Sequence, residues 1–284
     1  MDWENLRHFL AMIDSGSLAG AAKTLRVERT TVSRRIRALE AETGLSLFTR
    51  RGRRLELTAA GHDLAAAARP MAEAAIHARR LAAGLKPGMR GRVRISAPPA
   101  LAAARLVAPL VALGRRYPEL EIQLVGEMRH ASLSRGEADI AIRLSRPETG
   151  DLAISKLGDM AFRLYASADY LQKTPASHWR YIGQGDAADA LPQQALLNRI
   201  AKGNIAFYSD EIQLQAAAAE AGAGVAALPD FAVGGRAGLV PVPPGKPLLT
   251  RQIWSVVHTE QRQQERIGKV IETLRRALRG KAAA

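Results

Sequence analysis

The amino-acid sequence predicts an α+β protein of several domains: an N-terminal winged helix-turn-helix, a long linker helix and a C-terminal two-lobed α/β domain. Three observations predict this fold class. Three short helical patterns and a basic hairpin fill residues 1–58, an alanine-rich heptad pattern fills residues 59–86, and short β-prone runs alternate with helical runs over residues 92–284. A hinge rich in proline and glycine, residues 87–91, separates the second part from the third.

The composition indicates a globular chain with a polyanionic partner. Its 284 residues, 47% of them hydrophobic, suffice for two or three compact domains. Lys and Arg number 41 against 27 Asp and Glu, a formal net charge of +14 that favours nucleic acid as the partner. Cysteine is absent, which excludes disulfides and thiolate sites. The first ten residues hold no apolar signal segment, and the most apolar stretch, residues 100–114, is too short to span a bilayer. We therefore expect a cytoplasmic protein with no membrane partner.

The first two helices are predicted from one apolar stripe and one turn. Leu6, Phe9, Leu10 and Ile13 share a face of a helix over residues 3–13. The run 15–17, Ser-Gly-Ser, ends this helix and supplies a hydroxyl N-cap for a second helix over residues 18–25.

A third helix, residues 29–42, is predicted to bury one face and to offer hydrogen-bond donors on the other. Val32, Ile36 and Leu39 recur at the spacing of a buried helical face. A donor face without carboxylates suits a DNA major groove, although a solvated charged face is the alternative. The candidate DNA-binding residues of this helix are Arg29, Thr30, Thr31, Ser33, Arg34 and Arg37.

A basic hairpin follows this helix. Residues 47–57 have apolar ends around Gly52, which predicts a two-stranded wing whose tip touches backbone phosphate. A solvated hairpin is the alternative for the segment taken alone. The candidate phosphate contacts are Arg50, Arg51, Arg53 and Arg54.

The linker helix carries a heptad seam that predicts pairing of two copies. Small residues at most seam positions allow close approach, whereas Pro70 predicts a kink. A long helix packed only within its own chain is the alternative. The seam consists of Leu64, Ala67, Met71, Ala74, Ala78, Leu81 and Leu85.

Beyond the hinge, alternating strands and helices predict a parallel α/β sheet in two lobes. We expect the first strands at residues 93–97, 121–125 and 139–144, and a second set from Phe162 to Val242. A strand over residues 252–258 and an amphipathic helix then close the chain. Lobe I is expected over about residues 92–161 and 251–284, and lobe II over about residues 162–250.

Residues 21–61 resemble the DNA-binding domain of LysR-type transcriptional regulators. The resemblance rests on Ala21-Ala22, Val27, Ser33-Arg34, Ile36-Arg37, Leu39-Glu40, Gly44, Leu47-Phe48, Leu57-Thr58 and Gly61. It implies that the third helix enters the major groove, that the wing follows the backbone, and that a homodimer or homotetramer reads a dyad-symmetric operator. The family commonly has Ser, Gln and Pro where this chain has Glu28, Arg29 and Thr30. Since Glu28 is a poor cap, capping by Thr30 or Thr31 is an alternative that would withdraw a hydroxyl from base contact.

The second domain is similar to the effector-binding domain of the same family, which resembles periplasmic solute-binding proteins. This similarity implies a small-molecule effector in the interlobe cleft, with small carboxylates as the candidate class. Ala100 stands where the family usually places a Ser or Thr, so an atypical ligand or no ligand is the alternative. Turn formation, ion pairing and core packing are alternative roles for the candidate cleft residues, which are Pro98, Pro99, Ala100, Leu101, Glu127, Met128, Arg143, Tyr208 and Ser209.

No motif predicts catalysis, a metal or a cofactor. The string Gly222-Ala-Gly224-Val-Ala-Ala227 fits GxGxxA, but it lies between a helix and a following strand, the reverse of the dinucleotide-binding order. The six histidines show no HxxxH or HxH pair, and no GxSxG or GxxxxGK[ST] string occurs. Two alternatives to a specific regulator are an architectural DNA-binding protein and a solute-binding α/β protein with an incidental basic N-terminus.

Overall fold

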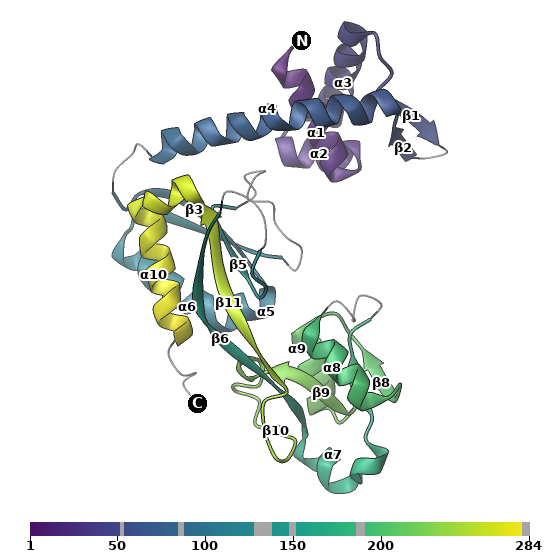
Figure 1. Cartoon of the computed structure of the whole chain (residues 1–284), viewed down its shortest axis with the longest axis vertical. Coiled ribbons are helices and arrows are strands. Elements are labelled where there is room, and N and C mark those ends of the chain that lie inside the picture. Colours follow the sequence, from purple (N-terminus) through teal and green to yellow (C-terminus); the bar gives the residue numbers. More distant parts are fainter. Residues whose placement is uncertain (52–53, 85–87, 128–137, 148–151, 186–190, 280–284) are drawn as a thin grey trace. The chain divides into compact units, whose positions relative to one another are not determined.

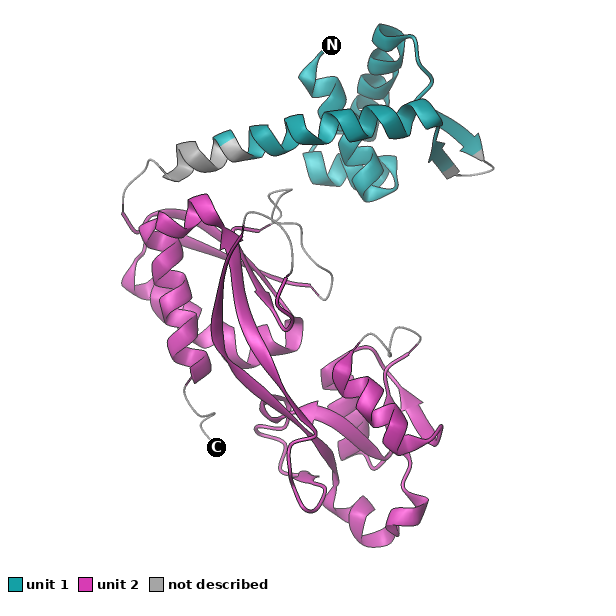
Figure 2. Ribbon diagram, viewed as in Figure 1, with its two compact units in different colours: residues 1–83 teal, residues 84–284 magenta. Residues whose placement is uncertain are grey.

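The computed structural model describes residues 1–51, 54–84, 88–127, 138–147, 152–185 and 191–279. The chain divides into two compact units, residues 1–83 and residues 84–284 (Figure 2). Each unit contains its own clusters of buried apolar residues. The two units are therefore described separately.

Unit 1 is a bundle of three helices followed by a hairpin and a long helix (Figure 1). Phe9, Leu39 and Leu47 are fully buried between these elements, and the rings of Phe9 and Phe48 meet edge to face with centroids 5.6 Å apart. The elements are α1 (Trp3–Ser15), α2 (Leu18–Leu25), α3 (Arg29–Thr43), β1 (Phe48–Arg51), β2 (Arg54–Leu57) and α4 (Ala59–Gly84).

The predicted junction between the first two helices is confirmed. Gly16 ends α1 with φ at 65°, a left-handed conformation that glycine adopts at little cost. The Ser17 hydroxyl then accepts a hydrogen bond from the Gly20 N–H at 3.0 Å and caps α2. These two caps end α1 and start α2 within a connection of two residues, Gly16 and Ser17.

Helix α4 packs its first turns against the core of unit 1. Ala65 and Ala68 are buried there, and the Thr58 hydroxyl accepts a hydrogen bond from the Gly61 N–H at 3.0 Å. Helix α4 extends on both sides of Pro70, which has no N–H to donate, so the element is one helix from Ala59 to Gly84 and the kink at Pro70 stays a prediction.

Unit 2 is built on one mixed sheet with helices on its faces. Its strands are β3 (Gly91–Ala97), β4 (Leu120–Gly126), β5 (Ile140–Arg143), β6 (Leu152–Ser167), β7 (Tyr181–Gly183), β8 (Ile205–Tyr208), β9 (Val225–Pro229), β10 (Leu239–Pro241) and β11 (Leu249–His258). Its α-helices are α5 (Pro99–Leu101), α6 (Val107–Arg116), α7 (Ala168–Lys173), α8 (Pro192–Ala201), α9 (Ile212–Glu220) and α10 (Glu265–Arg279). One π-helical segment, η1 (Ala102–Leu106), and the 3₁₀ segments η2 (Ala176–His178), η4 (Asp230–Ala232) and η5 (Thr259–Gln263) also belong to this unit.

The sheet consists of two parallel blocks joined by two long antiparallel strands. The strand order is β4-β3-β5-β11-β6-β9-β7-β8, with β10 paired to β6. Strand β3 runs parallel to β4 and β5, and β7 runs parallel to β8 and β9. The prediction of a wholly parallel sheet is wrong at the connection, because the chain leaves the first block along β6 and returns along β11 in the opposite direction.

The two blocks define two lobes. We use lobe I for β3, β4 and β5 with α5, η1, α6 and α10, and lobe II for β7, β8 and β9 with α7, α8, α9 and η4. The lobe I core includes Ile95, Ile140 and Val270. Lobe II has one apolar cluster around Ile182 and another around Leu197. Strand β6 begins at Leu152 and passes the expected lobe boundary near residue 161 without a break.

Candidate functional site

Helix α3 separates an apolar face from an exposed cationic face. Val32, Ile36 and Leu39 are buried against the bundle. The predicted DNA-binding residues lie on the other side, where Arg29, Thr30, Arg34 and Arg37 are exposed and Thr31 and Ser33 are half-buried. The surface of α3 thus offers guanidinium and hydroxyl groups to an outside partner.

The N-terminus of α3 has no side-chain cap. The cap position is Glu28, whose carboxylate makes no capping hydrogen bond, although its carbonyl accepts from the Thr31 N–H at 3.0 Å. The structure therefore contradicts the alternative in which Thr30 or Thr31 caps α3. Because the helix starts at Arg29, both hydroxyls lie in its first turn and not at the cap.

Part of the donor face lies in a groove of unit 1. This groove has a volume of about 1040 Å³ and is formed by the end of α1, the start of α2, α3 and the hairpin. Arg29, Ser33 and Arg37 of α3 line it, and Arg50 enters from β1. Arg34 is exposed but is not part of the lining. Three guanidinium groups from two elements thus surround one concave surface.

Glu40 and Arg35 carry structural roles that the sequence reasoning missed. Glu40 lines the groove, and its Oε1 accepts hydrogen bonds from the N–H groups of Leu47 at 2.8 Å and Phe48 at 3.4 Å, which holds the start of β1 against α3. Arg35 binds Asp2 at 3.1 Å, and Asp2 in turn caps α1. Arg35 therefore has a structural role, because its ion-pair partner belongs to the same domain. The sequence does not reveal this pair, since Asp2 and Arg35 are brought together only by the fold.

The hairpin presents its arginines in a short antiparallel register. Arg50 pairs with Leu55, and Arg51 pairs with Arg54 at the last described position of the ladder. Arg50 is exposed, whereas only the backbone of Arg51 and Arg54 is described. Arg53 lies outside the described residues.

The heptad seam of α4 divides between a core face and an exposed face. Leu64 packs against the core of unit 1. Ala67, Met71, Ala74 and Ala78 are exposed, and 51% of the Met71 surface is accessible. Only the backbone of Leu81 is described, as part of α4, and Leu85 lies outside the described residues.

A cleft of about 160 Å³ lies between the lobes of unit 2. Five of the predicted cleft residues line it: Pro98, Ala100, Leu101, Glu127 and Arg143. Pro99 is not part of the lining and packs instead beside Gly126. Tyr208 is 62% exposed with its ring beside Gly183, and the Ser209 hydroxyl accepts a hydrogen bond from the Glu211 N–H at 3.2 Å. Met128 lies outside the described residues.

The cleft also holds residues that the sequence reasoning missed. Arg251 comes from β11, which with β6 forms the pair of long strands between the lobes, called the crossover strands below. Its guanidinium donates to the Gln193 Oε1 at 3.1 Å and to the Leu144 carbonyl at 3.2 Å. It therefore joins helix α8 of lobe II to the segment after β5 in lobe I. The available signal was an arginine shortly before the apolar residues Ile253 and Trp254 of the same strand. Lobe II adds Gln184, Asp210, Glu211 and Ile212 to the lining.

Two half-buried arginines, Arg143 and Arg251, place cationic groups in the cleft lining beside the carboxylates of Glu127, Asp210 and Glu211. Burial lowers the pKa of both Arg143 and Arg251, and the nearby carboxylate of Glu127 acts in the opposite direction on the pKa of Arg143. The Arg143 guanidinium donates to the Ile142 carbonyl at 2.8 Å and to the Ser96 hydroxyl at 3.3 Å. These contacts hold the Arg143 guanidinium in place in the cleft lining.

Together, the cationic winged helix-turn-helix and the two-lobed domain with its polar cleft define a class of protein: DNA-binding regulators with a separate ligand-binding domain. The chain belongs to the LysR family. Residues 3–62 match the family described as bacterial regulatory helix-turn-helix protein, lysR family, and residues 86–279 match the LysR substrate binding domain. It is therefore a DNA-binding transcriptional regulator with an effector-binding domain.

The relatives are transcriptional regulators. PtxR of Pseudomonas aeruginosa is 27% identical over 301 residues, which cover 96% of this chain and 93% of PtxR. A regulator of Xanthomonas campestris pv. campestris is 30% identical over 165 residues, which cover 58% of this chain and 48% of that relative, so this match spans about half of its length.

Solved structures of the family share the fold. Full-length AphB of Vibrio cholerae aligns with a TM-score of 0.65 at 22% identity, over 96% of this chain and 98% of AphB. Full-length CbnR in complex with its target DNA aligns with a TM-score of 0.62 at 20% identity, over 98% of this chain and all of CbnR (100%). Among the described residues, no helix is both long and apolar enough to span a membrane.

Proposed function

We propose that the groove of unit 1 binds an operator with α3 in the major groove and the hairpin against the backbone. The observation that carries this proposal is the convergence of Arg29, Ser33, Arg37 and Arg50 on one concave surface. Bidentate guanidinium groups recognise the acceptors of guanine, and hydroxyls accept or donate to several base edges. Arg34, exposed beside the groove, is placed to contact phosphate.

We propose that two copies pair through the exposed part of the α4 seam and read the two halves of a dyad-symmetric operator. Ala67, Met71, Ala74 and Ala78 lie within one helical stripe of small or flexible side chains. The alternating spacings of three and four keep this stripe on one side of the helix. We also propose a cytoplasmic location, which a DNA target in a bacterial cell supports.

Selection of bound duplexes from a random pool tests the proposal about DNA. We expect enrichment of two inverted half-sites and retention of the selected duplex at about 150 mM salt. Equal retention of all sequences would instead favour an architectural DNA-binding protein, whose affinity comes from phosphates alone. Loss of all retention at that salt concentration would favour a solute-binding protein with an incidental basic N-terminus.

For the interlobe cleft, we propose a small effector that carries both a carboxylate and an amino group. Arg143 and Arg251 offer two cations at the base of the cleft, while Glu127, Asp210 and Glu211 supply acidic groups from both lobes. A carboxylate would bind the guanidinium groups, and an ammonium group would face the carboxylates. Such a ligand would contact both lobes and favour one arrangement of them over another.

Calorimetric titration with amino acids and matched simple carboxylates tests the effector proposal. We expect an amino acid to bind more tightly than the acid that lacks its amino group, and Arg143→Gln to abolish binding. Tighter binding of the simple acids would show that the acidic residues of the cleft do not contact the ligand.

A further inference from the structure

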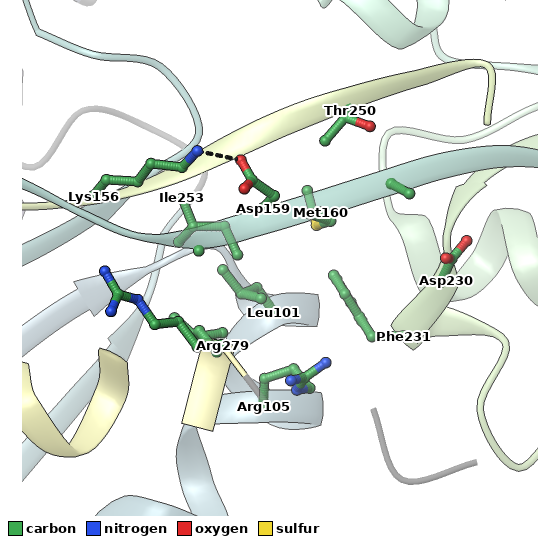
Figure 3. A pocket seen from close by; sticks show the side chains of 13 residues that line it. Leu101, Arg105, Lys156, Asp159, Met160, Asp230, Phe231, Thr250, Ile253 and Arg279 are labelled. Carbon is green, nitrogen blue, oxygen red and sulfur yellow. Dashed lines mark ion pairs between the residues drawn. The ribbon is translucent and has the colours of Figure 1, made fainter. Parts of the chain in front are cut away.

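A second cavity, of about 550 Å³, lies on the crossover strands of unit 2 (Figure 3). Strand β6 contributes Lys156, Asp159 and Met160, and strand β11 contributes Thr250 and Ile253. Leu101 and Arg105 enter from α5 and η1, Phe231 from η4, and Leu278 and Arg279 from the end of α10. The volume falls within the range of about 300–1,000 Å³ that small-molecule sites occupy.

We propose that this cavity is a second ligand site, which takes a small monocarboxylate with an apolar body. One part of its wall is apolar, where Leu101, Met160, Ile253 and Leu278 are buried and the half-buried Phe231 adds an aromatic ring, and the rest is polar or charged. Figure 3 shows Leu101, Met160, Phe231 and Ile253 around this part of the cavity. An aromatic ring or a short alkyl chain is the ligand body that such a surface favours.

The charged residues of the cavity favour an anion over a cation. Both carboxylates in the lining already have cationic partners within the domain. Asp159 binds Lys156 at 2.8 Å, and Asp230 binds Arg163 and accepts a hydrogen bond from the Tyr165 hydroxyl at 3.0 Å. A cationic ligand would have to compete with these pairs for the carboxylates.

Two arginines mark the position of the ligand carboxylate. Arg105 donates to the Ala277 carbonyl at 2.8 Å, which fixes its guanidinium beside the end of α10. Arg279 is exposed in the last turn of α10 and has no ion pair within the described part of the chain. Figure 3 shows both residues on the side of the cavity opposite Thr250. A carboxylate at this side would gain charge-assisted hydrogen bonds that an amide cannot reproduce.

The cavity is coupled to the interlobe cleft by a shared wall. Leu101, Met160 and Phe231 line both spaces. A ligand in the second cavity would contact η4 of lobe II, α5 and η1 of lobe I, and both crossover strands. Its affinity would therefore depend on the arrangement of the lobes, and by linkage it would change the affinity of the cleft for the effector.

Titration of the purified full-length protein with phenylacetate, hexanoate and phenylacetamide tests this proposal. We expect saturable binding of at least one carboxylate at millimolar concentration and at least tenfold weaker binding of phenylacetamide. Arg279→Gln is expected to weaken carboxylate binding about tenfold, because it removes charge-assisted hydrogen bonds. Thr250→Phe should block the cavity from its exposed rim without changing a buried residue.

Arg143→Gln is the matched control, since Arg143 lines the interlobe cleft alone. Carboxylate binding that survives Arg143→Gln and is lost in Arg279→Gln and Thr250→Phe would support a second site. If binding is lost in Arg143→Gln and unchanged in the other two variants, the probe binds in the interlobe cleft. This result would overturn the second site and leave the proposal of an effector cleft intact. Absence of saturable binding by either carboxylate would also overturn it.

Discussion

At the residue scale, Gly224 shows why a short motif needs its structural context. Gly222 has φ at 84° and Gly224 has φ at 149°, both in the region that favours glycine. A Cβ atom on Gly224 would lie 2.4 Å from the Arg180 carbonyl oxygen. The GxGxxA string thus forms the close turn from α9 into β9, and the shape of that turn explains both glycines.

Gly224→Ala is expected to destabilise unit 2, because the backbone of Arg180 cannot move aside as a flexible side chain would. We expect a loss of about 2 kcal/mol or more in the free energy of unfolding. Gly114→Ala is the matched control, since a Cβ atom there meets nothing within 4 Å and alanine favours the helix. Urea unfolding compares the two variants, and equal stability would contradict this reading of the turn.

The arginines of α3 are expected to divide into two roles. Arg29→Ala should relax base preference at one step at a cost of about 1–3 kcal/mol on the selected operator. Arg34→Ala should weaken binding to all sequences and lower the salt slope by about one. Arg7→Ala, which removes an exposed arginine paired with Glu4 on α1, controls for the change in net charge. Fluorescence anisotropy at several salt concentrations measures the effects, and identical profiles for Arg29→Ala and Arg34→Ala would refute the division.

Residue chemistry alone predicted some side chains of the site and missed others for a physical reason. Arg143 was identified because it lies at the carboxyl end of a predicted strand, where ligands bind in α/β domains. Arg251 lies in a strand that pairs with a segment about ninety residues earlier in the chain, so its place in the cleft depends on a long-range pairing. Arg35 has the same chemistry as Arg34, yet its partner Asp2 is brought near only by the packing of α1 against α3.

At the element scale, the wing depends on an acceptor supplied by α3. The Glu40 carboxylate accepts hydrogen bonds from the N–H groups of Leu47, just before β1, and of Phe48, at the start of β1. Because Leu47 is fully buried, its N–H has little access to water if this acceptor is removed. The position of Arg50 along β1 therefore depends on Glu40, which explains an acidic side chain inside a cationic groove.

Glu40→Ala is expected to lower the stability of unit 1 by about 1–3 kcal/mol, since it leaves a buried donor without its partner. It should also weaken operator binding through the displaced hairpin. Glu40→Gln keeps a side-chain oxygen at the same place and is expected to restore most of both properties. Hydrogen exchange of the Leu47 and Phe48 amides, together with operator titration, checks this. Unchanged exchange in Glu40→Ala would show that the carboxylate does not hold the strand.

Local patterns predicted most elements, and the exceptions involve long-range pairing. The bounds of α2 agree with the predicted range of residues 18–25, because its cap and its breaker lie next to the segment itself. The first ten residues of β6 were missed, since Leu152–Ala161 mixes apolar residues with Lys156, Gly158 and Asp159. This half-strand is held by its pairing with β11, which is distant in the sequence.

At the scale of the whole molecule, the proposed reading of a dyad-symmetric operator needs two copies that act together. A single α3 contacts one half-site, and a second contact within the same dimer raises the local concentration of the other helix near its half-site. The residues Ala67, Met71, Ala74 and Ala78 are exposed, whereas Ala65 and Ala68 pack inside unit 1. A substitution at an exposed seam position therefore leaves the buried residues of α4 unchanged.

Met71→Glu is expected to separate the copies without unfolding unit 1, because Met71 is 51% exposed and a charge at the centre of the seam would be buried on pairing. Ala66→Glu is the matched control, since Ala66 is also exposed but lies about 140° around the helix from Met71. Light scattering should report a lower mass for Met71→Glu and an unchanged mass for Ala66→Glu. Met71→Glu should also lose much more affinity for an operator with two half-sites than for an isolated half-site. If both variants keep the mass and affinity of the unmodified protein, the copies pair through another surface.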